Sequence, residues 1–371
     1  MTSQPLWKLV RLDFNRSPVH FGETGIGLEN TTERVHSDTL FSAWVSAYAK
    51  IFGKSAVEAL FERFTEPVPP FRLSSSFIYQ HHDSNGEQSC IYYLPKPIAR
   101  PPNYPSEDLS FAKTYRKLIY LPLSVWQRWY QRGGFSTQDA NTLAAYTKAP
   151  ESIGDRDPLF AAGTFAYEDA FKINTLPKVS IDRSTRATNF YHTKFVQYAE
   201  QAGLYFLMSM SNHNTALLHE LQAALLFLGE EGIGGERSSG AGRFTPSWHN
   251  LPKEWQSLFE AKDATHHSLI SLFWAKPETQ QFSQVEQALN EKAQSQTYYS
   301  LKPRGGWIAS PAGHQMRRQV VSMMAEGSVL PASIFPGGPV GALADVTPAR
   351  FNRHRIYRSG VSVSLPVALA L

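Results

Sequence analysis

A glycine-rich segment, GEEGIGGERSSGAGRF at Gly229–Phe244, constrains the fold of this chain more than any other stretch. It holds six glycines, two serines and two arginines, and it follows an apolar run of helical spacing at Leu217–Leu228. Glycine at this density lets a ligand approach the main chain and lets neighbouring N–H groups point outward together. With the charges of Arg237 and Arg243, the segment predicts a site for phosphate oxygens.

Two familiar phosphate-binding loops do not fit this segment. A dinucleotide-binding fingerprint follows a strand and opens a helix, whereas this loop follows a helix. A Walker loop needs Gly-Lys-Ser or Gly-Lys-Thr, which the segment lacks. The simpler alternative is an ordinary loop at a helix C-terminus, with Gly229 as the first residue beyond the cap.

The length and composition predict two domains. A chain of 371 residues with 42% apolar and 18% charged residues can bury two cores. We expect an N-terminal domain at 1–175, a basic hairpin and link at 176–200, and a C-terminal domain at 201–371. A single cysteine, Cys90, permits no internal disulfide or cysteine metal cluster and is typical of a reducing cytoplasm. The sequence shows no signal peptide and no apolar run of membrane-spanning length, so we expect a cytoplasmic protein without a membrane partner.

The basic residues are concentrated in two stretches. The formal net charge is only +4, but Lys178–Lys194 and Arg350–Arg358 are locally basic, which favours a track for a polyanion. The first stretch alternates and then turns near Asp182, so it predicts a protruding hairpin with a basic, hydroxyl-rich edge. Phe190 and Tyr191 follow and are able to stack on bases. A solvated surface hairpin is the alternative.

Several polar clusters that resemble catalytic or metal sites have simpler explanations. His36-Ser37-Asp38 predicts a helix start capped by Ser37, because three consecutive helical side chains diverge and cannot form a triad. His81 and His82 lie near an Asn-Gly turn without a carboxylate or cysteine partner. Acidic residues fall in separate segments without shared ligand spacing. We therefore expect no metal and no catalytic residues.

Both halves of the chain show the same order of elements: strand, loop, helix, hairpin strands, helix, strand. This is the β-α-β-β-α-β pattern of ferredoxin-like domains, whose sheets often present a face to RNA. The predicted fold is α+β, with tandem ferredoxin-like (RRM/RAMP) domains, glycine-rich loops and a protruding β-hairpin thumb.

At these residues the chain resembles a known family. HFGETGIGLE, HSDTLFSAW and the glycine-rich segment resemble the RAMP proteins of CRISPR systems, and VSIDRSTRATN adds to the match. The combination is most similar to the Csm-type subunit, fourth in the Csm naming, of type III-A effector complexes. The resemblance implies a non-catalytic, cofactor-free subunit for antiviral defence that caps the 5′ repeat-derived tag of the crRNA. It also implies a thumb that bends the guide, and docking on a large palm-domain polymerase/cyclase-type subunit and on the adjacent backbone RAMP subunit.

The resemblance also implies which residues bind RNA. The tag is expected to lie along Gly232–Gly235, Arg237–Gly240 and Gly242–Arg243, beside His20–Gly22, and the thumb is expected at Lys178–Asn189. A further basic turn with two glycines, at Lys302–Trp307, adds Arg304 to the expected RNA-binding residues. For Arg350–Arg358, the expectation of RNA binding rests on charge alone. The expected RNA-binding residues are His20, Phe21, Gly22, Lys178, Ser180, Arg183, Arg186, Asn189, Gly232, Gly234, Gly235, Arg237, Ser238, Ser239, Gly240, Gly242, Arg243 and Arg304.

The main alternative is a metal-independent RAMP endoribonuclease that matures crRNA, with His20 or His36 as general acid or base. Neither histidine has a Tyr, Ser or Lys partner at a recognisable spacing. A subunit whose basic patches bind only acidic protein surfaces is a further alternative. A steep salt dependence of RNA binding distinguishes the RNA-binding subunit from that scaffold.

Overall fold

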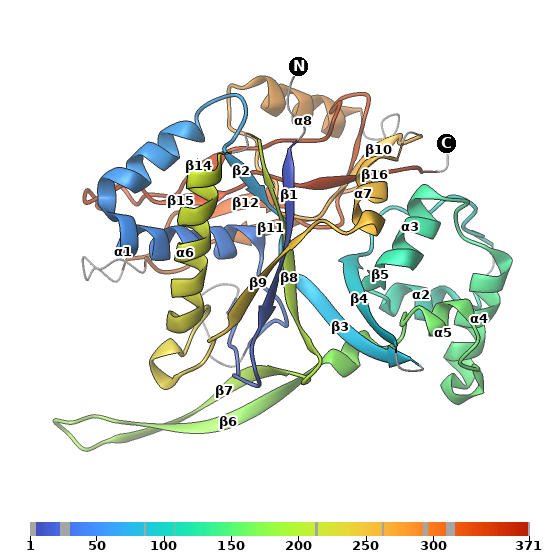
Figure 1. Cartoon of the computed structure of the whole chain (residues 1–371), viewed down its shortest axis with the longest axis horizontal. Coiled ribbons are helices and arrows are strands. Elements are labelled where there is room, and N and C mark those ends of the chain that lie inside the picture. Colours follow the sequence, from blue (N-terminus) through green and yellow to red (C-terminus); the bar gives the residue numbers. More distant parts are fainter. Residues whose placement is uncertain are drawn as a thin grey trace.

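The computed structural model describes residues 5–22, 30–84, 87–107, 109–211, 214–261, 263–291, 296–308 and 316–369. The central element is β1 (Leu6–Asp13), which pairs antiparallel with β8 (Ala202–Met210) on one side and β9 (Thr245–Asn250) on the other. The full sheet runs β5-β4-β3-β8-β1-β9, with short β2 (Phe71–Leu73) also paired to β8 (Figure 1). Its outer strands are β3 (Phe77–Ser84), β4 (Glu87–Pro95) and β5 (Tyr120–Pro122).

Two helices cover one face of this sheet. They are α1 (Ser37–Arg63) and α6 (Thr215–Glu231), and α1 bends at Gly53, whose φ is 82°. Trp44 of α1 is buried, and its indole N–H donates to Leu221 O at 2.8 Å, which ties the two helices together. The order β1-α1-β3 followed by β8-α6-β9, with β3-β8-β1-β9 side by side, is a ferredoxin-like unit.

The domain boundary predicted at residue 201 is wrong. Strands on both sides of that position pair in one sheet, with Val10 of β1 opposite Phe206 of β8. The N-terminal unit therefore extends through β9, and residues 87–198 lie between its second and third sheet strands in sequence. The periodicity predicted the element types, but a repeated strand-and-helix order does not say which strands pair.

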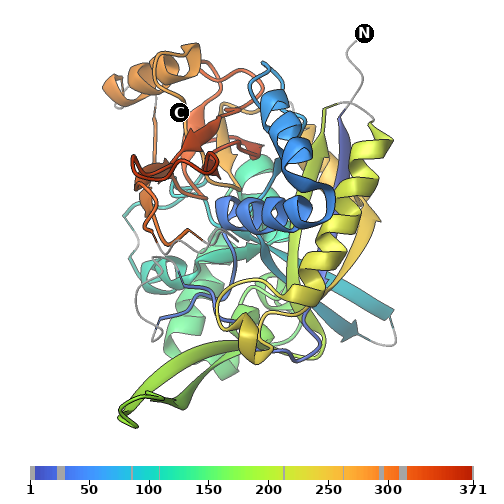
Figure 2. The same cartoon turned by 90° about the vertical axis from the view of Figure 1, so that its left-hand side faces the viewer.

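The segment between those strands carries a helical subdomain and the hairpin. The subdomain consists of α2 (Ala112–Lys117), α3 (Leu123–Gln131), α4 (Thr137–Lys148), η1 (Pro150–Ser152), α5 (Pro158–Ala161) and η2 (Tyr167–Ala170). Trp126 and Trp129 of α3 are fully buried, so they form its core. The hairpin of β6 (Phe171–Ile181) and β7 (Thr188–Tyr198) projects from the body (Figures 1 and 2). The predicted thumb at Lys178–Asn189 is the outer part of this longer hairpin.

The C-terminal unit is a reduced version of the same plan. Its elements are β10 (His266–Leu269), α8 (Gln280–Asn290), β11 (Leu301–Arg304), β12 (Val321–Met324), β13 (Val329–Pro331), β14 (Leu343–Asp345), β15 (Tyr357–Ser359) and β16 (Ser364–Val367). β10 pairs with β13 and β16, and Tyr298 bridges to Val329 beyond them, which is again the ferredoxin strand order. Between β13 and β16 the chain forms β14 and β15 in place of a second helix. The predicted α+β fold with a protruding hairpin is confirmed.

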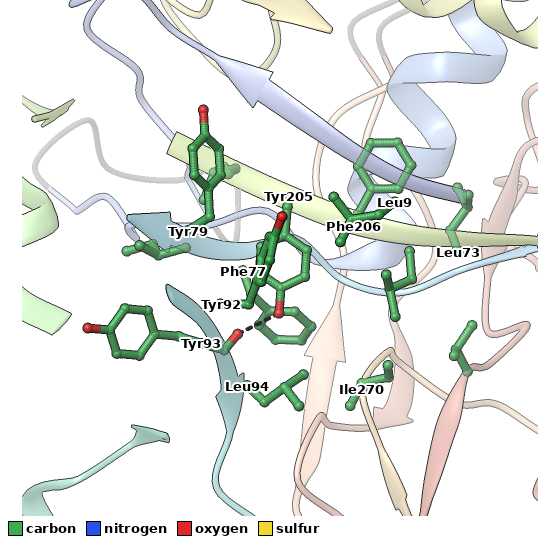
Figure 3. Close-up of a cluster of buried hydrophobic side chains, with 14 of the residues drawn as sticks. Leu9, Leu73, Phe77, Tyr79, Tyr92, Tyr93, Leu94, Tyr205, Phe206 and Ile270 are labelled. Atoms are coloured by element: carbon green, nitrogen blue, oxygen red, sulfur yellow. Dashed lines mark hydrogen bonds between the residues drawn. The ribbon is translucent and has the colours of Figure 1, made fainter. Parts of the chain in front are cut away.

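One large hydrophobic core spans both units, and two smaller clusters lie within the C-terminal unit. Figure 3 shows Leu9, Phe77 and Tyr205 of the first sheet near Ile270, and the Tyr205 hydroxyl donates to Tyr93 O at 2.7 Å. Backbone bonds cross the junction too: Ser75 N donates to Ile270 O at 2.9 Å. α7 (Lys253–Phe259), which links the units, packs its buried Trp255 against Tyr205. Because burial of apolar area stabilises in proportion to area, this continuous core holds the units together.

Candidate nucleic-acid interface

The glycine-rich segment begins inside a helix. α6 continues to Glu231 and is capped by Gly232, with φ 85° and ψ 155°. Gly229 is therefore a helical residue, and the alternative that placed it beyond the cap is wrong. A Cβ on Gly229 would lie 2.3 Å from Phe244 O, so this glycine lets the end of the segment pack directly on the helix.

The segment then docks against residues 18–21 through main-chain hydrogen bonds. Gly235 N donates to His20 O at 2.8 Å, and Gly242 N donates to Pro18 O at 2.9 Å. Ile233 N donates to Gly242 O at 2.9 Å, which closes the segment on itself. The amides of Gly235 and Gly242 are occupied in this way, so they do not supply the outward-facing phosphate donors that the sequence predicted. Their role is close packing of backbone on backbone.

The surface of the segment is formed by its second half. Arg237, Ser238, Ser239, Gly240 and Arg243 are all exposed, the first three as the single turn η3 (Arg237–Ser239). An open depression of about 560 Å³ lies beside them, lined by Lys50, Glu231, Gly234, Gly235, Glu236, Arg237 and Ser238. Lys50 Nζ is 2.7 Å from Glu231 Oε2, so one of its cations is already paired. The guanidinium groups and the Ser238 hydroxyl remain as the donors for an anionic ligand, whereas the Ser239 hydroxyl donates to Glu236 O at 2.8 Å.

The hairpin joins this surface both at its base and in its outer part. Val19 and Val196 form an antiparallel bridge, and His20 Nδ1 is 2.8 Å from Lys194 O. Lys178 forms an ion pair with Glu236 of the glycine-rich segment and lies 5.2 Å from the centre of the Phe195 ring. The structure thus brings the glycine-rich segment, residues 18–21 and the hairpin into contact with one another.

The hairpin has two chemically different faces. Lys178 pairs with Tyr191 and Ser180 with Asn189, so these four side chains share the polar face. The polar face is the one turned toward the glycine-rich segment, because Lys178 contacts Glu236 there. On the opposite face lie exposed apolar side chains: Val179, Ile181 and Phe190 are 56%, 63% and 61% exposed. The predicted RNA-binding residues of the strands all lie on the polar face.

The hairpin tip carries the two predicted arginines. Arg183 and Arg186 are exposed, and Arg186 has a left-handed backbone with φ 57°. Asp182 shapes the turn by accepting from Ser184 N at 2.7 Å and Thr185 N at 3.0 Å. These backbone hydrogen bonds lower the pKa of Asp182. The tip therefore presents positive charge at the end of a defined turn.

Three predicted contact side chains are buried instead, those of His20, Phe21 and Arg304, and the backbone positions Gly232 and Gly242 are buried as well. His20 and Phe21 are 4% and 5% exposed, so they support the glycine-rich segment from beneath rather than offer rings for stacking. Gly22 follows them and lies within reach of His20, since its Cβ would be 3.6 Å from the His20 ring. Residues 23–29, which continue the HFGETGIGLE stretch that begins at His20, lie outside the described residues.

The side chain of Arg304 is also buried, and it forms its hydrogen bonds within the protein. It is 2% exposed, and its Nε and Nη2 donate to Asp38 at 2.9 and 3.0 Å. Arg358 also pairs with Asp38 and donates to Gly305 O. Both guanidinium groups thus bind the carboxylate of Asp38, which belongs to the N-terminal unit. Because Arg304 is buried at this junction of the units, it cannot contact RNA directly. The assignment of Arg304 as an RNA contact is wrong because sequence alone does not reveal this partner.

The His36-Ser37-Asp38 motif joins the two units through side-chain contacts. His36 is the N-cap residue of α1 without a side-chain cap bond, so the prediction of capping by Ser37 is wrong. The Ser37 hydroxyl instead accepts from Leu272 N at 3.0 Å. His36 Nδ1 is 2.7 Å from Glu326 Oε1, and Asp38 binds the two arginines. All three consecutive side chains therefore contact the C-terminal unit.

The charges at this junction between the units are buried and paired. Burial alone would raise the pKa of Asp38, but Arg358 and Arg304 outweigh it and the pKa is lowered. The pKa of Glu326 is lowered likewise, against its burial, by Arg34 and His36. Both carboxylates are thus ionised partners of a junction that joins α1 to β11, β12 and β15.

The described residues contain neither a candidate metal site nor a candidate membrane-spanning helix. No group of three or more His, Cys, Asp or Glu side chains there could hold a metal ion. No helix within the described ranges is long and apolar enough to cross a membrane.

With this geometry in place, the comparisons with known proteins define the class. The profile described as "RAMP superfamily" matches residues 16–245, which is more than half of the chain and runs from just after β1 to the start of β9. The chain belongs to the RAMP superfamily. The profile described as "CRISPR Csm4 C-terminal domain" matches residues 262–367, which correspond to the reduced C-terminal unit.

Relatives and solved structures narrow the class to one kind of subunit. The chain is similar to "CRISPR system Cms protein Csm4" of Methanocaldococcus jannaschii, at 23% identity over 94% of both chains. The protein of the same name from Mycobacterium tuberculosis is 27% identical over 98% of this chain and 97% of its own. A chain in the crystal structure of a Csm3-Csm4 subcomplex superposes with a TM-score of 0.57 at 19% identity, covering 97% of this chain and 99% of that one. A chain in the crystal structure of a Csm1-Csm4 cassette superposes with a TM-score of 0.54 at 18% identity, covering 99% of this chain and 99% of that one. These two likenesses show a shared fold.

Proposed function

We propose that this chain is the subunit of a type III-A CRISPR effector complex that binds and caps the 5′ repeat-derived tag of the crRNA. Membership of the RAMP superfamily and the Csm4 relatives, matched over nearly their whole length, support the place in the effector complex. One observation carries the RNA-binding role: the exposed half of the glycine-rich segment and the polar face of the hairpin form one surface. The role of the complex is antiviral defence.

The chemistry of this surface suits single-stranded RNA. Arg237 and Arg243 supply guanidinium groups for phosphates, and Ser238 supplies a hydroxyl. Ser180 and Asn189 extend these donors along the hairpin, and the arginines of the tip add charge at its end. Contacts of this kind fix the position of the backbone, while target choice belongs to base pairing by the guide.

The partners follow from the relatives. Solved structures of similar fold include a Csm3-Csm4 subcomplex and a Csm1-Csm4 cassette. We propose that this chain likewise docks on a large palm-domain subunit of Csm1 type and on the adjacent backbone RAMP subunit of Csm3 type. The exposed apolar face of the hairpin, with Val179, Ile181 and Phe190, is available for protein contacts on the side away from the glycine-rich segment.

The subunit is proposed to be non-catalytic. The endoribonuclease alternative required His20 or His36 to act on RNA, but both side chains are nearly buried and bonded within the protein. His36 lies in the junction between the units, where Glu326 and Arg34 surround it. A general acid or base must reach the proton it transfers, so the geometry does not favour this alternative.

Substitution of the two exposed arginines tests the RNA-binding role. We expect Arg237→Ala with Arg243→Ala to weaken binding of tag RNA to the purified chain by about 2–4 kcal/mol, as loss of charge-assisted contacts would. Fluorescence anisotropy with a labelled tag oligonucleotide measures this. The matched control is Arg132→Ala with Arg156→Ala, which removes two exposed arginines from the helical subdomain. Equal affinities for both double variants would refute the assigned surface.

Purification from the native cells tests the complex itself. We expect the tagged chain to bring down guides that share one 5′ repeat-derived tag, together with a large palm-domain protein. Repeat RNA incubated with the recombinant chain should remain intact. Specific cutting that is lost in His20→Ala or His36→Ala, with folding retained, would establish the endoribonuclease instead.

A further inference from the structure

Three arginines gather around one carboxylate where the two units meet. Arg304 and Arg358 both bind Asp38, whose side chain is fully buried. Arg318 is the third arginine: burial, and then the positive charges of Arg358 and Arg304, lower its pKa to about 10. The charge of Asp38 acts in the opposite direction, but its carboxylate is bound by Arg304 and Arg358. The cluster therefore carries more positive than negative charge.

Arg318 differs from the other two in having no partner. In the ranges that the structure describes, its guanidinium makes no hydrogen bond or ion pair, and its Nε is buried without an acceptor. Desolvated positive charge next to two like charges costs stability in the free protein. A feature that breaks the rule of paired buried charge without a gain in stability is typical of a binding site.

The chain around Arg318 gives an anion close access. Arg318 N donates to Gly306 O at 2.9 Å, which places it across from the Gly305–Gly306 turn. Gly306 has φ +115°, and a Cβ there would lie 3.6 Å from Arg358 Nη2. Neither glycine presents a side chain, so an oxygen-bearing group meets little steric obstruction at this turn.

The neighbouring residues favour RNA over a protein carboxylate as the occupant. Trp307 is 45% exposed and bridges to Arg317, whose guanidinium lies 5.0 Å from the centre of the Trp307 ring. An exposed tryptophan beside arginines is the combination with which proteins bind single-stranded RNA, by stacking on a base and neutralising a phosphate.

We propose that Arg318, at the Gly305–Gly306 turn, is a second phosphate subsite for single-stranded RNA, separate from the glycine-rich segment. The inference rests on the proposed function, because the phosphate belongs to the same RNA ligand. It replaces the expected role of Arg304: the glycine turn binds RNA through Arg318, while Arg304 and Arg358 hold Asp38 behind it.

The test compares the salt dependence of RNA binding among variants of the full chain. Each phosphate contact to single-stranded RNA contributes about 0.7 to the slope of log K against log salt concentration. We expect Arg318→Gln to lower that slope by about 0.7 and to weaken binding about tenfold, as loss of one charge-assisted contact does. Arg318→Lys should keep most of the slope, and Arg132→Gln, an exposed arginine of the helical subdomain, should leave both quantities unchanged.

Unfolding by denaturant separates a binding role from a structural one. Arg318→Gln should unfold at the same or a higher denaturant concentration than the native chain, because it relieves repulsion. A variant that unfolds earlier while its salt slope stays native would make Arg318 structural and overturn the inference. So would native RNA affinity with weakened capture of the large subunit, which would assign Arg318 to a protein carboxylate.

Failure of the inference can be told apart from failure of the proposed function. If Arg237→Ala with Arg243→Ala weakens RNA binding but Arg318→Gln binds as the native chain does, only the second subsite is refuted. If the native chain binds no single-stranded RNA at all, the proposed function falls and the second subsite falls with it.

Discussion

At the scale of single residues, Asp38 shows how one carboxylate can hold two units together. It binds Arg304 and Arg358 with no exposure to solvent. We expect Asp38→Asn to destabilise the chain by about 3–5 kcal/mol, the cost of leaving buried charges without their partner. Chemical denaturation measures the change, and Asp155→Asn, at an exposed aspartate, is the control. A loss no greater than that of the control would show that the junction does not depend on this carboxylate.

Glu326 should make the stability of the protein depend on acidity. Its folded pKa lies well below the ordinary value of 4.5, so the stabilisation is complete above the unfolded pKa and is lost as the pH falls. We expect the free energy of unfolding to decrease from about pH 5 to pH 3, and Glu326→Gln to flatten that decrease. Denaturant titrations at several pH values measure both slopes. Identical pH dependence in the two proteins would contradict the assignment.

Residue types, rather than partners, are what the sequence revealed at this scale. Arg237 and Arg243 were predicted at the surface of a glycine-rich loop, and they are exposed there. Arg304 looked equivalent because it also precedes glycines, yet its partner Asp38 lies 266 positions away in sequence. No local spacing reveals a contact of that range. Burial of the arginine depends on the fold as a whole.

At the scale of elements, the glycine-rich segment depends on how closely backbones approach. A Cβ on Gly242 would lie 2.1 Å from Ile233 O, whereas one on Gly240 meets nothing within 4 Å, and both glycines have positive φ. Gly240→Ala should therefore cost only the backbone strain, about 1–2 kcal/mol. Gly242→Ala should cost clearly more and disturb RNA binding, as thermal unfolding and anisotropy would show. Equal costs would mean that backbone strain alone requires these glycines.

The hairpin is expected to shape the guide more than it binds it. Its outer part contacts the glycine-rich segment through Lys178, and its tip carries two arginines beyond that contact. Shortening the turn at 182–186 should change nuclease protection of the guide near the tag–spacer boundary, while affinity for the tag falls only a few-fold. Protection that is identical to that of the native complex would show that the hairpin is not the thumb.

At the scale of the whole molecule, element types were easier to predict than connectivity. Helical spacing located α6, and the turn near Asp182 located the hairpin. The predicted boundary at 201 failed because β8 follows a long insertion yet pairs with β1. Leu9, Tyr205 and Ile270 belong to one core although they come from both units. Such pairing is decided by apolar burial across the chain rather than by local pattern.

That shared core leads to a prediction about cooperativity. Bonds across the junction include Gln131 Nε2 to Pro366 O at 2.6 Å and Leu272 N to Ser37 Oγ at 3.0 Å, beside the continuous apolar contacts. We expect the full chain to unfold in a single transition with equal calorimetric and van't Hoff enthalpies. Residues 1–250 alone should be markedly less stable, because separation exposes the core that Ile270 and Val363 cover. Two separate unfolding transitions in the full chain would instead show that the units fold independently. The ion pairs of Asp38 with Arg304 and Arg358 would then only dock one folded unit on the other.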